Sequence, residues 1–267
     1  MSSKIITIRT NGSDFSLETK KQLAEILQAR GYTTTDEYTP QTELVVCIGG
    51  DGCLLKAVHI CDFPDCPFVG INTGHLGFFQ EVHPEDMEVF VDDYSCGNYT
   101  IQHMHTVNAA VTTVDKRVHH HIGLNEVVVK GKYSNTIHLD ISIDGKPIEK
   151  FSGDGIVVAT SAGSTAYNYS LGGSIVDPRI RLLQVTPIAP MNTTAHRSFT
   201  SSVLLPAELS LGVVPENTKN EVLVVNDGIE NNYTNIKDIE ITISDKIVNL
   251  IRFSDYDFWN KVKNKFL

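Results

Sequence analysis

The sequence has no apolar run long enough to cross a membrane and no excess of basic residues. A membrane-spanning helix needs about 18 or more consecutive apolar residues, and no segment of the 267-residue chain approaches that length. Lys and Arg number 22 against 32 Asp and Glu, which gives a net charge of −10. The cationic contacts to phosphate that supply most nucleic-acid affinity are therefore scarce. We expect neither a membrane nor a nucleic acid as a partner.

Cysteines and histidines form no recognisable metal-binding or disulfide pattern. The five cysteines are an odd number, and Cys47 lies inside an apolar run, which favours reduced thiols and a cytoplasmic protein. Cys61 and Cys66, with the nearby His59, lack the second ligand pair of a structural zinc site. The run His119–His121 is interpreted as a solvated loop, because adjacent side chains on a strand point to opposite faces. We therefore expect no metal-binding residues.

The first 98 residues alternate strand-like and helix-like segments, which predicts a Rossmann-like α/β domain with a small parallel sheet. Gly31 stands where a left-handed helix cap is expected, and Pro84 stands at the start of a helix, where it costs no hydrogen bond. The predicted strands are residues 5–8, 44–48 and 67–71, and the predicted helices are residues 16–30, 53–60 and 84–94.

From residue 99 to residue 267 the pattern changes to many short strands, which predicts an all-β, sandwich-type domain. Asp144-Gly145 is a hairpin signal, and a helix-like insertion at 164–171 begins with Ser164 as a candidate N-cap. A terminal amphipathic helix over about 255–266 is expected to pack back on the first domain through Trp259 and its aromatic neighbours. The predicted strands are 99–114, 122–130, 136–143, 156–160, 222–225, 239–243 and 247–253.

Gly49-Gly50-Asp51-Gly52 is the sharpest local pattern, and it follows the predicted buried strand 44–48 directly. Glycines let backbone N–H groups approach an anion, and the N-terminus of the next helix adds partial positive charge. A carboxylate in such a phosphate site would accept a proton from an attacking hydroxyl or help to hold magnesium. The alternative is an ordinary tight turn. The P-loop motif is absent, and Leu55 stands where the dinucleotide fingerprint has its third glycine.

Two further polar clusters interrupt the strand-rich half. Residues 151–155 read F-S-G-D-G, and residues 161–173 are dense in small hydroxyl side chains. Such residues suit a polar, planar ligand, and they also serve simple turn capping. Asn125-Glu126 stands inside an apolar strand, where it is either an outward-facing pair or a chelate for a ribose diol or a nucleobase edge.

The clusters follow one another in a fixed order along the chain. They read GGDG at 49–52, GINTGHLGF at 70–78, LNE at 124–126, GDG at 153–155 and STAYNYSLGG at 164–173. In this order they resemble the motif set of the bacterial NAD kinase family, with matches from about Leu44 to Pro206. GGDG alone is shared with phosphofructokinases and lipid kinases, whereas five motifs in sequence are specific.

The resemblance implies a phosphotransferase that moves the γ-phosphoryl group of ATP, or of polyphosphate in some members, to the 2′-hydroxyl of the adenosine ribose of NAD, giving NADP. It implies the α/β plus β-sandwich fold predicted above and assembly into homodimers or homotetramers. Mg²⁺ is expected to arrive with the nucleotide, held mainly by its phosphates.

The resemblance also implies roles for individual residues. Asp51 matches the proton-accepting Asp, within the phosphate-binding turn of Gly49, Gly50 and Gly52. Asn125 and Glu126 match residues that hold adenine and its ribose. Asp154 matches a residue that reaches the nicotinamide end, from its own subunit or across a subunit boundary. The remaining dinucleotide-binding positions implied by the resemblance are Ala162, Thr165, Ala166, Tyr167, Ser170 and Ala189.

Three departures from the family pattern concern the same motifs. Cys53 replaces the usual Thr after GGDG, and a thiol is the weaker hydrogen-bonding group. Ala162 lacks a hydroxyl that could touch adenine, and Ser152 stands where some members carry a basic residue. Two other functions remain open at this point: a lipid or sugar kinase built on GGDG, and a catalytically idle NADP(H) sensor.

Overall fold

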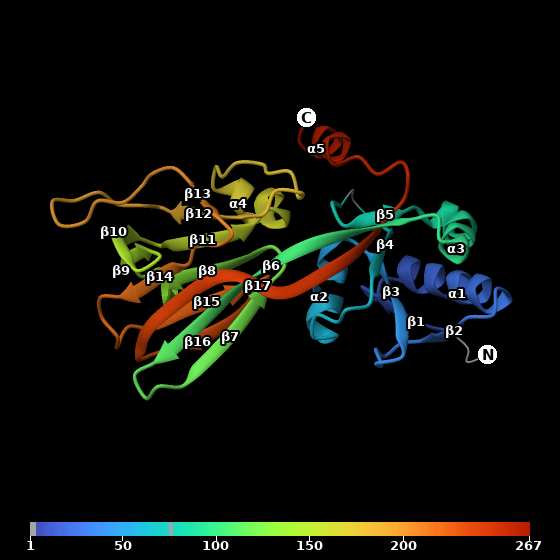
Figure 1. Cartoon of the computed structure of the whole chain (residues 1–267), viewed down its shortest axis with the longest axis horizontal. Coiled ribbons are helices and arrows are strands. Elements are labelled where there is room, and N and C mark those ends of the chain that lie inside the picture. The colour runs from blue at the N-terminus through green and yellow to red at the C-terminus, as the bar shows by residue number, and fades with distance from the viewer. Residues whose placement is uncertain (1–3, 75–76) are drawn as a thin grey trace. The chain divides into compact units, whose positions relative to one another are not determined.

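The chain forms two compact units in the computed structural model, which describes residues 4–74 and 77–267. The first unit comprises the residues up to Met104 together with Ile247–Leu267, and the second comprises His105–Lys246. Two long strands, β6 (Thr100–Thr113) and β17 (Ile236–Arg252), contribute residues to both units (Figure 1). The first unit is therefore discontinuous in sequence. His75 and Leu76 of the 70–78 motif lie outside the described residues.

The first unit is built on a parallel sheet, as predicted. Its strands lie in the order β2-β1-β3-β4-β17, with β5 beside β4, and every pair is parallel. The central strand β3 has no exposed residue between Leu44 and Gly49, which explains its continuous apolar run. The strands are β1 (Ile5–Thr10), β2 (Thr33–Thr35), β3 (Thr42–Gly49), β4 (Phe68–Asn72) and β5 (Gln80–Val82).

Helices cover both faces of this sheet. Leu23 and Leu27 of α1 and Phe90 of α3 pack on the face that carries Leu44 and Val46, while α2 contacts the same strands β1, β3 and β4 from its own side. Gly31 adopts φ +85° at the end of α1, so the predicted left-handed cap is confirmed. The helices are α1 (Asp14–Ala29), α2 (Asp51–Ile60), α3 (Met87–Cys96) after the 3₁₀ turn Pro84–Asp86, and the terminal α5 (Phe258–Phe266).

The second unit is a sandwich of two antiparallel sheets, which confirms the predicted fold class. One sheet has the order β10-β9-β14-β17-β6-β7, and the other has the order β13-β12-β11-β8-β15-β16. The buried side chains of the two inner faces form one core that includes Phe151. The strands are β7 (Val118–Gly123), β8 (Glu126–Gly131), β9 (Ile137–Ile143), β10 (Lys146–Gly153), β11 (Gly155–Thr160), β12 (Leu182–Ile188), β13 (Val203–Pro206), β14 (Leu211–Pro215), β15 (Val222–Asn226) and β16 (Ile229–Tyr233).

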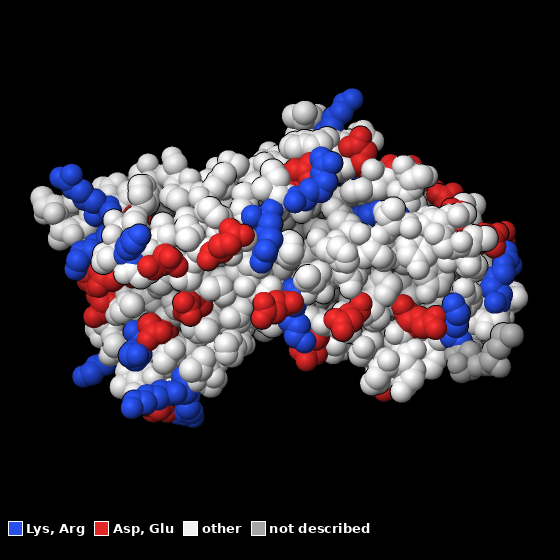
Figure 2. Space-filling view, in the orientation of Figure 1, with Lys and Arg blue, Asp and Glu red and all other residues white. Residues whose placement is uncertain are grey.

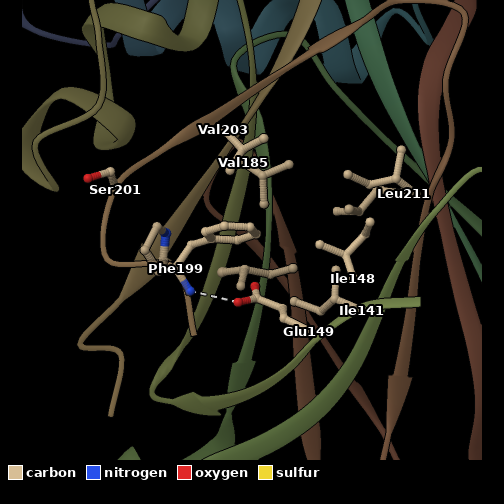
Figure 3. A pocket seen from close by; sticks show the side chains of 11 residues that line it. Ile141, Ile148, Glu149, Val185, Phe199, Ser201, Val203 and Leu211 are labelled. Carbon is tan, nitrogen blue, oxygen red and sulfur yellow. Dashed lines mark hydrogen bonds between the residues drawn. The ribbon is translucent and has the colours of Figure 1, made fainter. Parts of the chain in front are cut away.

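An apolar pocket opens into this sandwich between the two sheets. Ile141 and Leu211 line it from one sheet and Val185 from the other, and the ring of Phe199 covers it (Figure 3). Glu149 lies at its edge and accepts a hydrogen bond of 2.7 Å from the backbone N–H of Phe199. This bond fastens the long connection between β12 and β13 to strand β10.

Several local predictions are wrong. The strand predicted at 122–130 is divided between β7, which ends at Gly123, and β8, which begins at Glu126. His119–His121 lie on strand β7 rather than in a loop, with the rings of His119 and His121 against Tyr233. The two strands predicted at 239–243 and 247–253 are the single strand β17. Ser164 is not an N-cap, because its hydroxyl is buried between the backbone N–H and C=O of Val176.

The terminal helix α5 packs within the first unit through two of its aromatic residues. Phe258 and Phe266 both contact Phe78, with ring centroids 5.9 and 5.8 Å away. Trp259, which was expected to share this role, is instead 51% exposed. The aromatic contact to Phe78 places the end of α5 next to the GGDG turn.

The distribution of surface charge and the polarity of the helices are those expected from the composition. Acidic and basic side chains are interspersed on the face shown in Figure 2. Within the described ranges, 4–74 and 77–267, the helices are all too short or too polar to cross a membrane.

Candidate functional site

The GGDG turn lies between β1 and β3, where the chain connections begin to move in opposite directions across the parallel sheet. Strand β1 connects through α1 to β2 on one side, and β3 connects through α2 to β4 on the other. Ligands of open α/β sheets bind at such a switch point, outside the carboxyl ends of the strands. Gly49 ends β3 and Gly50 is the N-cap of α2, so the turn combines close backbone access with a helix N-terminus.

Gly49 is required by its surroundings. A Cβ at this position would lie 2.8 Å from the Cβ of Cys53 and 3.2 Å from the Cβ of Asn11, closer than carbon atoms pack. Asn11 follows β1 and donates its backbone N–H to Ile48. Asn11 is thus a neighbour of the GGDG turn that sequence analysis missed, and its polar side chain directly after a strand was the available signal.

The carboxylate of Asp51 holds the backbone at Phe78 and Phe79. Its two oxygens accept hydrogen bonds from the backbone N–H groups of Phe78 and Phe79, at 2.9 and 3.0 Å. A Cβ on Gly77 would overlap the same carboxylate. The Nζ of Lys265, on α5, lies 4.0 Å from Asp51 Oδ2. Each carboxylate oxygen has a second lone pair, so Asp51 can still accept a proton or a hydrogen bond from a ligand.

Cys53 occupies the first turn of α2 at the position where a departure from the family pattern was noted. Its thiol points back to the backbone carbonyl of Ile48, 3.5 Å away. The pKa of this thiol is raised, because burial disfavours the thiolate. Cys53 therefore contributes a weak structural hydrogen bond within the turn.

In the second unit, Asn125 and Glu126 present two buried acceptors. Both residues are buried at the start of β8, and neither Asn125 Oδ1 nor Glu126 Oε2 has a hydrogen-bond partner among the described residues. Buried polar atoms are normally paired, and an unpaired one calls for an explanation. A ligand with amino and hydroxyl donors would pair both atoms.

Asp227 fixes the backbone that carries this pair. Its carboxylate accepts hydrogen bonds from the backbone N–H groups of Leu124, Asn125 and Glu126, at 2.6, 2.8 and 3.2 Å. Asp227-Gly228 forms the tight turn between β15 and β16, with both residues at positive φ. Sequence analysis missed Asp227, although the dipeptide Asp-Gly carries the same turn signal as Asp144-Gly145.

The environment of Glu126 keeps its carboxyl group protonated near neutral pH. Burial, followed by the nearby negative charge of Asp227, raises the pKa of Glu126 to about 8. A hydrogen bond from the backbone N–H of Tyr167 opposes this shift. Perturbed acids of this kind concentrate at functional sites. Glu126 can donate a hydrogen bond as an acid or accept two as a carboxylate, which suits a pair of ribose hydroxyls.

The small-residue turn after β11 packs directly on Asn125. Thr160 donates its hydroxyl to the carbonyl of Leu124 at 2.7 Å, and its backbone N–H to the carbonyl of Asn125 at 2.9 Å. A Cβ on Gly163 would overlap that Asn125 carbonyl. The predicted helical insertion is confirmed as a 3₁₀ turn, Ala162–Thr165, followed by the short helix α4, Tyr167–Ser170.

Buried polar contacts hold this turn while its tip stays open to solvent. Asn168 is fully buried and accepts a 2.6 Å hydrogen bond from Thr186. Tyr167 is 42% exposed, and Ser170 is exposed as well. Ala162, Thr165 and Ala166 are half-buried at the base of the same turn. The structure therefore groups these predicted ligand-binding residues around Asn125 and Glu126.

Asp154 and Ala189 lie together but away from that group. Asp154 donates its backbone N–H to the carbonyl of Ile188 at 3.0 Å, and a Cβ on the preceding Gly153 would lie 2.8 Å from the Ala189 carbonyl oxygen. Glu126 pairs with Ala159 at the other end of β11. The five residue-to-residue steps from Asp154 to Ala159 span about 16 Å of strand.

Comparisons with known proteins agree along the whole chain. Residues 10–99 match the family model for the ATP-NAD kinase N-terminal domain, and residues 124–253 match that for the ATP-NAD kinase C-terminal domain. The NAD kinase of Finegoldia magna is 37% identical over 269 residues, covering 99% of this chain and 98% of that protein. The NAD kinase of Staphylococcus carnosus is 34% identical, covering 87% and 86%.

Two solved structures share the fold. Yeast NADH kinase complexed with NADH superposes with a TM-score of 0.86 at 20% identity, covering 99% of this chain and 87% of that one. An NAD kinase from Archaeoglobus fulgidus in complex with ATP gives a TM-score of 0.77 at 22% identity, covering 97% and 98%.

Proposed function

The chain belongs to the NAD kinase family, and from this premise we propose how its residues carry out the reaction. It phosphorylates NAD with ATP as the phosphoryl donor, at the 2′-hydroxyl of the adenosine ribose. The observation that carries this conclusion is the continuous match to relatives named NAD kinase, at 37% identity over 99% of the chain. The two unpartnered acceptors at Asn125 and Glu126 support it independently, because they fit a nucleoside.

Asp51 is the proposed proton acceptor. A ribose hydroxyl is a poor nucleophile at neutral pH, and a carboxylate within hydrogen-bond reach accepts its proton as the bond to phosphorus forms. The amides of Phe78 and Phe79 fix the orientation of the Asp51 carboxylate. The remaining catalytic task is to align the hydroxyl with the γ-phosphate, next to the glycine-rich turn at the N-terminus of α2.

The dinucleotide is proposed to bind the second unit through its adenosine end. Asn125 Oδ1 accepts from the adenine amino group and Glu126 from the ribose hydroxyls, while the exposed ring of Tyr167 flanks the nucleoside. Asp154 and Ala189 serve the nicotinamide end. Asp154 is exposed, about 16 Å of strand from the partner of Glu126, and we propose that it acts on a dinucleotide bound by a neighbouring subunit of a homodimer or homotetramer.

Mg²⁺ is proposed to enter as part of the MgATP substrate and to neutralise charge on the transferring phosphoryl group. Asp51 is the acidic residue of the turn, and both of its oxygens already hold backbone N–H groups, which favours a metal held mainly by phosphates. The product is NADP. All five cysteines are free thiols, which supports the cytoplasm as the proposed compartment.

An end-point assay tests the reaction. The purified chain is incubated with NAD and either MgATP or polyphosphate, and 2′-phosphorylated dinucleotide is quantified, with NADH, diacylglycerol, sphingosine and fructose 6-phosphate as rival acceptors. We expect NADP from NAD and MgATP. Phosphorylation of a lipid or a sugar in preference to NAD would contradict the proposal, and so would saturable NADP binding without any turnover.

Asp51→Asn tests the proposed base. We expect kcat to fall by about 10²- to 10⁴-fold, with the affinity for NAD largely retained. Asparagine offers one acceptor where Asp51 uses two, so unfolding must also be measured, with an expected loss of about 1–3 kcal/mol. Asp62→Asn, an exposed position just beyond α2 with φ +57°, is the matched control. Full activity in Asp51→Asn would rule out the proposed role.

A further inference from the structure

Three residues that the proposed reaction does not use bring metal-binding atoms together in the second unit. His138 lies on β9, His196 lies in the connection between β12 and β13, and Glu216 directly follows β14. One nitrogen of each imidazole and one oxygen of the carboxylate all lie within 4.8 Å of one another. The sequence analysis expected no metal-binding residues and did not consider these three, which are far apart in the chain.

The backbone holds each of the three residues in place. Strand β14 pairs with β9, and the backbone N–H of Glu216 donates to the carbonyl of His138 at 3.0 Å. His196 closes a turn with Thr193, whose hydroxyl accepts the His196 N–H at 3.0 Å and whose own N–H donates to the His196 carbonyl at 2.8 Å. The imidazoles of His138 and His196 face each other with centroids 4.4 Å apart.

One side-chain nitrogen of this cluster has no hydrogen-bond partner among the described residues. His196 Nε2 lies 3.4 Å from Glu216 Oε1, which by itself describes an ordinary ion pair. That reading leaves His138 Nδ1 unexplained, since this nitrogen is buried without a hydrogen-bond partner among the described residues. In the tautomer that carries its proton on Nε2, an imidazole offers the lone pair of Nδ1 to a metal. Two imidazoles and one carboxylate are a set typical of Zn²⁺ and related transition metals.

One cation competes for the carboxylate. Lys150 Nζ lies 3.7 Å from Glu216 Oε1 and 3.5 Å from Asp140 Oδ1. Lys150 is largely exposed, so it can withdraw into solvent while keeping Asp140 as its partner. The ammonium group would therefore compete with a metal for Glu216 without blocking it.

We propose that His138, His196 and Glu216 bind a divalent transition-metal ion of the Zn²⁺ class. Three protein ligands leave a fourth position for water. The bound ion would tie the connection 189–202 to the sheet formed by β9 and β14. This connection already joins β10 through the Met191 N–H, which donates to the Ser152 carbonyl at 2.7 Å, and it begins at Ala189, one of the proposed dinucleotide contacts. The metal would thus stabilise a segment next to the nucleotide site.

The test uses the full chain, stripped of metal with EDTA and freed of the chelator. Zn²⁺ is titrated in competition with a chromophoric chelator, Co²⁺ binding is followed by visible d–d absorption, and thermal unfolding is recorded with and without Zn²⁺. We expect one ion per chain, a Co²⁺ spectrum typical of nitrogen and oxygen ligands, and a higher Tm with Zn²⁺. None of these measurements depends on turnover of NAD, so the outcome is separate from that of the proposed function.

Variants separate this site from adventitious binding. His196→Ala in the loop and Glu216→Gln are expected to weaken Zn²⁺ binding by at least about 100-fold, more than the loss of an outer hydrogen-bond partner does. Metal-free Tm values confirm that both variants fold. His120→Ala, in the histidine run of β7, is the matched control and should retain wild-type affinity. Wild-type Zn²⁺ affinity in His196→Ala, or loss of binding in His120→Ala instead, would overturn the proposal.

Discussion

The Glu126 side chain makes the stability of the free protein depend on pH. Its pKa lies at about 8 in the folded chain, whereas a glutamate in an unfolded chain titrates near 4.3. Between these two values the folded state holds a proton that the unfolded state has released. The free energy of unfolding therefore decreases as the pH rises through this window, by up to about 1.4 kcal/mol per pH unit.

Glu126→Gln removes this dependence. Glutamine stays neutral at every pH, so the variant should gain stability relative to the wild type as the pH rises from about 5 to 8, and the difference should level off above 8. The measurement is urea unfolding of both proteins at several pH values.

Glu88→Gln, at an exposed position of α3, is the control and should follow the wild type. Parallel pH profiles for Glu126→Gln and the wild type would show that Glu126 is already ionised in the free protein. The pH profile thus tests the protonation state without any ligand.

At the scale of elements, the turn after β11 depends on the absence of a side chain at Gly163. The carbonyl of Asn125 occupies the space that a Cβ would fill. That carbonyl also accepts a hydrogen bond from the backbone N–H of Thr160. The conformation of the turn is therefore coupled to that of the Asn125-Glu126 pair. Any residue larger than glycine must push the two segments apart.

Gly163→Ala should therefore lower both stability and affinity for NAD. We expect a loss of about 1–3 kcal/mol in the free energy of unfolding, and a higher KM for NAD with a smaller change in KM for ATP. Steady-state kinetics and urea unfolding measure the two effects. Ser174→Ala, an exposed side chain in the connection that follows, is the control. An unchanged KM for NAD in Gly163→Ala would separate the turn from the dinucleotide site.

The elements that sequence reasoning predicted are those with a strong local signal. Strand β3 is a continuous apolar run, α1 ends at a glycine with positive φ, and the hairpin at Asp144-Gly145 has both residues at positive φ. Asn125-Glu126 was found because two polar residues interrupt an apolar strand. In each case a short window of sequence contains the physical cause.

The features that sequence reasoning missed depend on contacts with residues far away in the chain. Strand β17 continues through the polar residues Ser244–Lys246, where the sequence pattern predicts a break, and there Thr106 of β6 donates its hydroxyl to the Lys246 carbonyl. Asp227 and Lys265 acquire their roles only from the segments they contact. No local pattern contains those contacts.

At the scale of the whole molecule, the exposed position of Asp154 allows a test of the proposed assembly. Asp154 is exposed at one end of the strand, and the partner of Glu126 lies at the other end, about 16 Å away. We expect Asp154 of one subunit to face the positively charged nicotinamide of a dinucleotide held by another. Such an arrangement makes each site depend on two chains.

Mixing two inactive variants tests this arrangement. Asp51→Asn lacks the proposed base, and Asp154→Arg is expected to repel the nicotinamide cation. A mixed dimer contains one site with both native residues, so random exchange of equal amounts should restore about one quarter of wild-type activity. Activity is assayed after subunit exchange, with mixed oligomers confirmed by native mass spectrometry.

A control mixture excludes other sources of recovery. Asp51→Asn mixed with the double variant Asp51→Asn, Asp154→Arg contains no native Asp51 and should stay inactive. Mixed oligomers of the two single variants that regain no activity would place Asp154 in the site of its own chain.

The discontinuous first unit also constrains the order of events during translation. Residue Leu250 of β17 pairs with Phe68 of β4, and Arg252 forms a buried ion pair with Glu81 at 2.8 Å. Both contacts need residues that leave the ribosome after the entire sandwich has been made. Until then the flank of β4 that faces β17 is paired only by the short strand β5, at Gly70 and Ile71, and the backbone at Phe68 lacks its neighbour. An incompletely paired edge of this kind can pair with other chains. We infer that the long central insertion folds first, and that the last twenty or so residues close the unit in which the chain began.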